Sequence, residues 1–107
     1  MGEAIVIMIT EIAQIEIKPG SEADFEAAVG KARAEFGASK GFHGFELHRS
    51  IEKPQRYRLM VKWATLENHT VDFRGSPQFA AWRALVGSYF ASAPEVEHTE
   101  TVVTAAG

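Results

Sequence analysis

The spacing of apolar residues changes along this 107-residue chain, and the change limits the folds that the chain can adopt. Apolar and polar residues alternate over residues 9–17, as in a strand with one buried face. Apolar residues recur at helical spacing between residues 21 and 37, after Pro19-Gly20 has ended the first pattern. The same reasoning predicts a strand, a helix, two strands, two helices and a strand over residues 9–17, 21–37, 42–51, 56–64, 65–75, 76–93 and 95–104.

This order of elements is that of the ferredoxin-like, or split βαβ, fold of the α+β class. It predicts an antiparallel sheet with helices on one face. Ser21 with Asp24 three residues later predicts a capping box at the start of the first helix. We expect a single domain over residues 1–107, with 1–8 as an N-terminal extension and 105–107 as a frayed tail.

The face of the sheet that the helices leave uncovered has a mixed composition. It carries Ile12, Gln14, Met60 and Val103 among polar residues. Such a face is too apolar for water and too polar for a closed core. A second copy whose sheet packs against it would cover it, which predicts a homodimer through facing sheets. The alternative is a mixed face exposed to water.

Composition excludes several classes of partner. The net charge of −3 leaves no basic face for nucleic acid or for an anionic membrane surface. The absence of cysteine excludes disulfides and thiolate chemistry. The apolar run over residues 4–9 follows Glu3 and is too short for a secretion signal. No run approaches the roughly 20 apolar residues of a membrane span. We therefore expect a cytoplasmic protein.

Three residues on consecutive predicted elements are the candidate catalytic residues. Trp63 closes a strand, His69 lies on the short helix that follows, and Arg83 lies on the next helix. His69 could act as a general base because imidazole titrates near neutral pH. Arg83 could stabilise a phenolate or enolate because it stays charged. The alternatives are a core histidine bonded to backbone and an exposed Arg83, or one paired with Glu11.

Glu11 and several aromatic residues are candidate substrate-binding residues. Glu11 lies on the predicted inward face of the first strand, where desolvation would raise its pKa and suit it to acid–base work. Aromatic side chains at these spacings either form a slot for a planar substrate or simply fill the core. They are Tyr57, Trp63, Phe73, Phe79 and Trp82.

The remaining histidines do not predict a metal site. His43 and His48 point to opposite faces of one strand, and His98 stands alone in the sequence VEHTE. The chain contains neither a G-x-G-x-x-G run nor a P-loop. We therefore expect neither a metal nor a cofactor.

Three segments resemble the antibiotic biosynthesis monooxygenase family of dimeric α/β barrels. They are IEIKPGSEADFEAAV, GFHGFELHRS and VKWATLENHTVDFRGSPQFAAWRALV, and together they cover most of the domain. The pattern W-x5-H followed by S-P-x-F is specific to the superfamily rather than to one reaction. Members include cofactor-free oxygenases of phenolic polycycles, quinol oxygenases, haem-degrading enzymes and an isomerase.

The resemblance separates the branches of this family residue by residue. Haem-degrading members have an Asn, a Trp and a His ligand where this chain has Ala13, Phe73 and Arg83, which implies that it binds no haem. The polyketide-oxidising branch is similar at Trp63 and Arg83. His69 replaces a Tyr of that branch and Leu59 replaces an Asn, which implies a related pocket with a different substrate.

The main hypothesis is a cofactor-independent monooxygenase of a small electron-rich aromatic or quinol-type substrate. The same base and the same cation also suit an isomerase that acts through an enediolate. A third hypothesis is a non-catalytic dimeric domain that binds a hydrophobic metabolite, or that only assembles.

Overall fold

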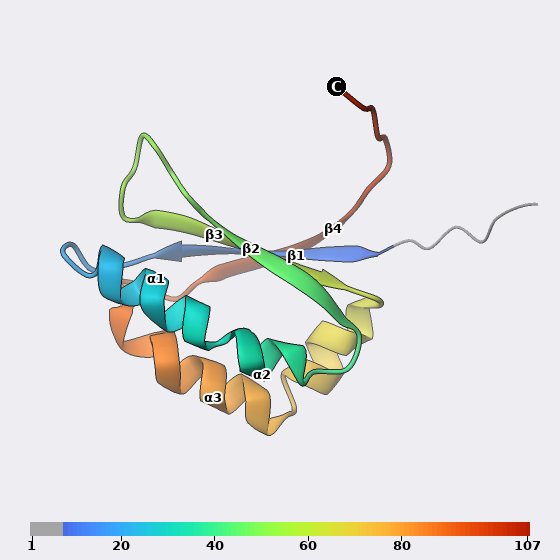
Figure 1. The fold of residues 1–107 in the computed structure, drawn as a ribbon, viewed down its shortest axis with the longest axis horizontal. Helices are drawn as coiled ribbons and strands as arrows, with labels where there is room; N and C mark the ends of the chain where they lie inside the picture. Colours follow the sequence, from blue (N-terminus) through green and yellow to red (C-terminus); the bar gives the residue numbers. More distant parts are fainter. Residues whose placement is uncertain (1–7) are drawn as a thin grey trace, which may run out of the picture.

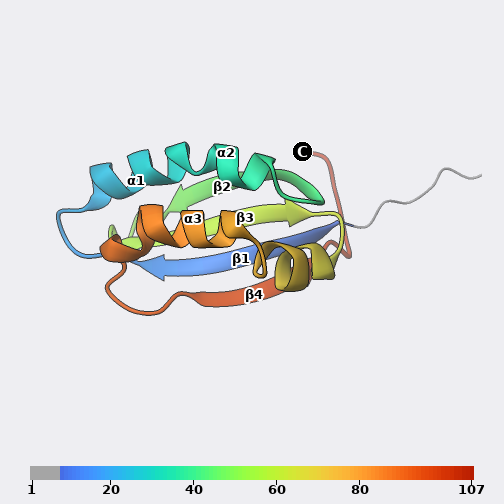
Figure 2. The ribbon, with the colours of Figure 1, turned by 90° about the horizontal axis from the view of Figure 1, so that it is seen from below.

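The fold is a four-stranded antiparallel sheet with its helices on one face (Figures 1 and 2), seen in a computed structural model that describes residues 8–107. The predicted ferredoxin-like fold class is confirmed. Of the predicted extension over residues 1–8, all but Met8 lies outside the described residues. The elements are β1 (Ile9–Glu16), α1 (Glu22–Lys31), α2 (Arg33–Gly37), β2 (Phe42–Arg49), β3 (Arg56–Trp63), η1 (Asn68–Phe73), α3 (Pro77–Val86), η2 (Gly87–Tyr89) and β4 (Glu95–Glu100).

The strands run in the order β2-β3-β1-β4, so β1 lies inside the sheet and β4 at one edge. Along β1 the side chains of Glu11, Ala13 and Ile15 are buried beneath the helices, whereas Ile12 and Gln14 lie half-buried on the other face. The predicted strand faces are therefore confirmed. In the register, Glu11 lies opposite His98 of β4 and Val61 of β3. Paired residues share a face, so these three side chains all point toward the helices.

The structure differs from the prediction in one helix, one strand end and one helix cap. The helix expected over residues 21–37 is interrupted at the buried Ala32, which separates α1 from α2. The strand expected over residues 95–104 ends at Glu100, so Val103 lies beyond the sheet and is exposed. No capping box forms at α1: the Ser21 side chain makes no cap bond, and Glu22 Oε1 instead accepts from the Gly20 N–H at 3.0 Å.

The core is built around Phe36 of α2. Its ring is stacked on Phe73 with centroids 4.9 Å apart and meets Trp82 edge-on at 5.2 Å. These contacts bring α2, η1 and α3 together over the sheet, and aromatic pairs of this kind add to the stabilisation from area burial. No helix within residues 8–107 is long and apolar enough to cross a membrane.

The short helix η1 is a π-helix, and it determines which side chains face the core. The Arg74 N–H donates to the His69 carbonyl at 3.1 Å, one residue further back than in an α-helix. His69 and Phe73 of η1 are buried, whereas Leu66, two residues before η1, is 40% exposed. Single π-turns are frequent at functional sites.

The start of η1 depends on a close approach of Asn68 to Gly41. Asn68 exchanges two hydrogen bonds with Thr65, accepting from its N–H at 3.0 Å and donating its own N–H to the hydroxyl at 3.1 Å. Gly41 has a φ of +77°, and a Cβ added there would overlap the buried Asn68 amide group. Gly20 has a φ of +87° but open space around a Cβ. The two glycines thus share a backbone conformation and differ in packing.

We predict that Gly41→Ala lowers the free energy of unfolding more than Gly20→Ala does. Both changes carry the cost of a left-handed residue, and only the first must also displace Asn68, which should add about 1–3 kcal/mol. Urea unfolding followed by circular dichroism measures both variants. Equal losses would mean that η1 does not depend on this contact.

Candidate functional site

A cavity of about 340 Å³ lies between the helices and the sheet. β1, β3 and β4 supply its floor, and η1, α3 and the segment after η2 supply its walls. Its volume is within the range of small-molecule sites. The predicted site residues that line it are Glu11, His69, Phe73, Phe79, Trp82 and Arg83.

Glu11 is buried beside two donors. The Trp63 indole N–H donates to Glu11 Oε1 at 3.0 Å, and His69 Nε2 lies 3.3 Å from the same oxygen. Glu11 is 6% exposed and His69 2% exposed. Among the described residues no side-chain oxygen is both fully buried and unpaired, and no donor is paired with Glu11 Oε2. Oε2 is therefore the carboxyl oxygen that is open to the cavity.

His69 continues this chain of polar contacts toward β4. Its Nδ1 lies 2.7 Å from Nε2 of His98, so one of these two nitrogens carries the shared proton. His98 is half-buried on the edge strand. The interpretation of His98 as an isolated residue is wrong, because the β1–β4 register places it opposite Glu11. Glu11, His69 and His98 form a continuous polar chain that begins at the cavity.

Burial sets the protonation of this chain. Desolvation raises the pKa of Glu11 from 4.5 to about 7, although the Trp63 hydrogen bond and the Arg74 charge oppose the rise. Desolvation, with smaller effects of Arg74 and His98, lowers the pKa of His69 to about 4. Desolvation and Arg74 also lower the pKa of His98. Near neutral pH both imidazoles are therefore uncharged, and the protonated and ionised forms of Glu11 are both present.

Two arginines border the same cavity. Arg83 is exposed at the cavity wall, and its guanidinium lies 6.0 Å from the ring centroid of Phe79 and 5.9 Å from that of Phe90. It does not pair with Glu11, whose nearest basic side chain is the uncharged His69. Arg74, which sequence reasoning missed, lies just after η1 and also lines the cavity. The one sequence feature that could have indicated Arg74 is its position at the end of the predicted short helix, directly before Gly75.

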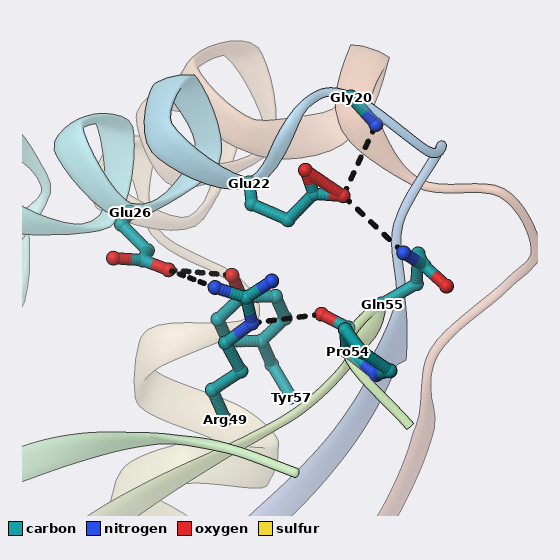
Figure 3. Close-up of polar contacts among 7 residues, drawn as sticks. All are labelled: Gly20, Glu22, Glu26, Arg49, Pro54, Gln55 and Tyr57. Atoms are coloured by element: carbon teal, nitrogen blue, oxygen red, sulfur yellow. Dashed lines mark hydrogen bonds and ion pairs between the residues drawn. The ribbon is translucent and has the colours of Figure 1, made fainter. Parts of the chain in front are cut away.

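Trp63 and Tyr57 lie outside the cavity lining. Trp63 is fully buried and stacks on His69 with centroids 5.6 Å apart, so it supports the polar chain from within the core. Tyr57 is also buried, and its hydroxyl donates to Glu26 of α1 at 2.6 Å. Figure 3 shows Tyr57 in a polar cluster with Glu26 and Arg49. Tyr57, which was predicted as a substrate contact, thus connects α1 to the sheet and does not line this cavity.

Within residues 8–107 no group of three or more His, Asp or Glu side chains has an arrangement that could hold a metal ion. Glu11 and His98 bind opposite nitrogens of His69 and so do not converge on one point.

Comparisons with known proteins agree on one family. The model of the family "Antibiotic biosynthesis monooxygenase" matches residues 8–85. The uncharacterized protein YczJ of Bacillus subtilis is 38% identical over 95 residues, which are 89% of this chain and all of that protein. A crystal structure from Bordetella bronchiseptica, described as a candidate antibiotic biosynthesis monooxygenase, is 56% identical with a TM-score of 0.89, over 90% of this chain and 98% of the other.

A more distant structure shares the fold. SnoaB of Streptomyces nogalater, named as a cofactor-independent oxygenase, is 18% identical with a TM-score of 0.70, over 92% of this chain and 95% of the other.

The opposite pKa changes of Glu11 and His69 predict opposite effects of pH on stability. Glu11 has a raised folded-state pKa, so its stabilisation is lost as pH rises from about 4.5 to 7. The folded-state pKa of His69 is lowered, so its stabilisation is lost as pH falls from about 6.5 to 4. Each difference between the folded and unfolded pKa corresponds to roughly 3 kcal/mol of stability, and in the native protein the two pH dependences nearly cancel.

Glu11→Gln should therefore make the free energy of unfolding rise with pH between 4.5 and 6.5, and His69→Gln should make it fall. Urea unfolding across this range measures both slopes, and the double variant is the control for all other groups. If both single variants kept the slope of the native protein, the two pKa changes would be absent.

Proposed function

Because this chain belongs to the antibiotic biosynthesis monooxygenase family, we propose that it is a cofactor-independent monooxygenase of a small electron-rich aromatic or quinol-type substrate. One observation carries the proposal: a cavity of about 340 Å³ is bordered both by a carboxyl with a pKa near 7 and by two guanidinium groups. This combination suits removal of a proton and stabilisation of the anion that remains.

The chemistry that we propose balances without an added reductant. A hydroxyl of the substrate loses its proton, and the electron-rich ring reacts with dioxygen at a carbon that bears hydrogen. One oxygen atom becomes bonded to that carbon and the other leaves as water. The substrate supplies the four electrons that reduce dioxygen, so a quinol becomes a hydroxyquinone and an anthrone-like ring becomes a quinone.

Glu11 is the group that we assign to proton removal. Sequence reasoning favoured His69, but both ring nitrogens of His69 already face protein partners. Glu11 Oε2 has no such partner among the described residues, and a pKa of about 7 lets the carboxylate accept a proton at neutral pH. His69 holds the other carboxyl oxygen and connects it to His98.

His98 is the residue that we assign to proton exchange with solvent. It is the member of the polar chain on the edge strand β4, and it is half-buried, whereas Glu11 and His69 are buried. A proton that reaches Glu11 can pass through the two nitrogens of His69 to His98 if protons shift across the 3.3 Å contact between Oε1 and Nε2 and along the hydrogen bond between the two rings. The cavity can thus return to its ionised state between turnovers.

The other site residues shape and charge the cavity. Arg83 and Arg74 stabilise the phenolate or enolate, since a guanidinium stays charged at every working pH. Phe73, Phe79 and Trp82 form the walls against a planar ring. These aromatic side chains leave the cavity unfilled, which argues against a domain that only assembles.

We also propose that two copies pair through the sheet faces that the helices leave uncovered. Ile12 and Met60 lie paired and half-buried on that face, so a second sheet would remove apolar area from water. A cytoplasmic location and a small-molecule partner complete this proposal.

We predict that the native protein consumes oxygen with a hydroquinone or an anthrone-like phenol in the absence of any added reductant. Glu11→Gln should lower kcat by about 10²-fold or more because it removes the base. The exposed Glu52→Gln, in the turn between β2 and β3 and outside the cavity lining, is the matched control and should keep full activity. An oxygen electrode measures all three proteins.

If the native protein consumed no oxygen with any such substrate, the oxygenase proposal would be wrong. The isomerase alternative uses the same base and cations but no oxygen. Turnover that continues at an undiminished rate in anaerobic buffer would favour it.

His98→Ala should slow turnover several-fold and make it depend on the buffer. Added imidazole can reach the vacated position and carry the proton, so the rate of the variant should rise with imidazole concentration while that of the native protein stays constant. Steady-state oxygen uptake measures this rescue. A slow variant that imidazole does not rescue would show that His98 has only a structural role.

A further inference from the structure

We propose that the substrate carries a carboxylate in addition to its oxidisable ring, and that Arg74 and Arg83 bind it. The inference rests on the proposed function and names the substrate class of the same cavity. Its basis is that two guanidinium groups line one cavity without a carboxylate partner. The contacts between carboxylates and basic side chains within residues 8–107 involve Glu11, Glu16, Glu26 and Glu46, and none of them includes Arg74 or Arg83.

Local structure holds the Arg83 guanidinium at the cavity and places Arg74 beside it. Arg83 lies one helical turn after Phe79, and its guanidinium lies about equally far from the rings of Phe79 and Phe90. Two aromatic contacts restrain a long side chain and favour the charged group beside the rings. The Arg74 backbone N–H closes the π-turn on His69, so the winding of η1 places Arg74 beside the polar chain. Its charge affects Glu11, His69 and His98.

The charged groups around the cavity leave a surplus of positive charge. His69 and His98 are uncharged near neutral pH, and Glu11, whose pKa burial raises to about 7, is only partly ionised there. A deprotonated ring hydroxyl adds one negative charge only during reaction. Against these stand two permanent positive charges, on a chain whose net charge is −3. This local surplus of positive charge attracts an anion before any proton is removed.

The shape of the cavity favours a carboxylate attached to an aromatic ring. Phe73, Phe79 and Trp82 supply flat apolar walls, and the volume of about 340 Å³ accommodates a planar molecule of two or three rings. A guanidinium binds a carboxylate through two parallel hydrogen bonds, an arrangement that a neutral hydroxyl cannot reproduce. The carboxylate would also orient the ring so that its hydroxyl reaches Glu11.

A pair of probes tests the proposal by binding alone. 1-Hydroxy-2-naphthoate carries the carboxylate, and 1-hydroxy-2-naphthamide has nearly the same shape without the charge. Isothermal titration calorimetry at pH 7 under nitrogen should give at least tenfold tighter binding of the carboxylate. This preference should decrease as salt is added, because screening weakens the attraction between exposed charges.

Variants connect the preference to the two arginines. Arg83→Gln and Arg74→Gln should each weaken binding of the carboxylate about tenfold and leave binding of the amide nearly unchanged. Arg83→Lys should retain part of the preference, because it keeps the charge but loses the planar fork. Arg33→Gln is the matched control: Arg33 is exposed on α2 and lies outside the cavity lining. Both replaced arginines are exposed, and thermal unfolding checks that the variants are folded.

Equal affinity for the two probes would overturn the proposal, and so would a preference that survives in both glutamine variants. These outcomes are separable from failure of the oxygenase proposal. Oxygen uptake with neutral hydroquinones, without any preference for the carboxylate, would leave the oxygenase standing and remove this inference. A preference for the carboxylate that depends on Arg74 and Arg83, without any oxygen uptake, would support this inference and remove the oxygenase proposal.

Discussion

The burial of one carboxyl group between an indole and an imidazole is the interaction on which the site depends. Glu11 lies on the helix-covered face of β1, where an ionised carboxylate loses the water that would stabilise it. The Trp63 N–H and the ring of His69 replace part of that solvation. The compensation is incomplete, which keeps the pKa near 7. A carboxyl of this kind is costly for stability and useful for proton transfer, and sites that combine these properties are often functional.

Much of the fold could be predicted because the strands alternate clearly between apolar and polar residues. The inward face of β1, including Glu11, followed from that alternation alone. The π-winding of η1 could not be predicted, since it is one residue out of step with an α-helix and responds to the packing of His69 and Phe73 in the core.

The polar chain shows a different limit of sequence reasoning. His69 was a candidate because it lies on the apolar face of a short helix just after a strand, and this pattern can be recognised within a few residues of sequence. His98 was not, because its partner is 29 positions away and the contact exists only through the β1–β4 register. Tyr57 shows a second limit: it lies inward, opposite the cavity-lining Ile15, but its buried side chain extends to Glu26 of α1 and does not line the cavity. Local patterns indicate faces, and only the assembled sheet shows which inward residues meet.

The central claim is that Glu11 titrates near neutral pH inside the folded protein, and nuclear magnetic resonance tests it most directly. Labelling glutamate with ¹³C at the side-chain carboxyl and following the Glu11 signal, assigned through Glu11→Gln, gives its pKa in the native state. We expect a midpoint near 7. A midpoint at the ordinary value of about 4.5 would mean that Glu11 is well solvated, and the account of the site would fail.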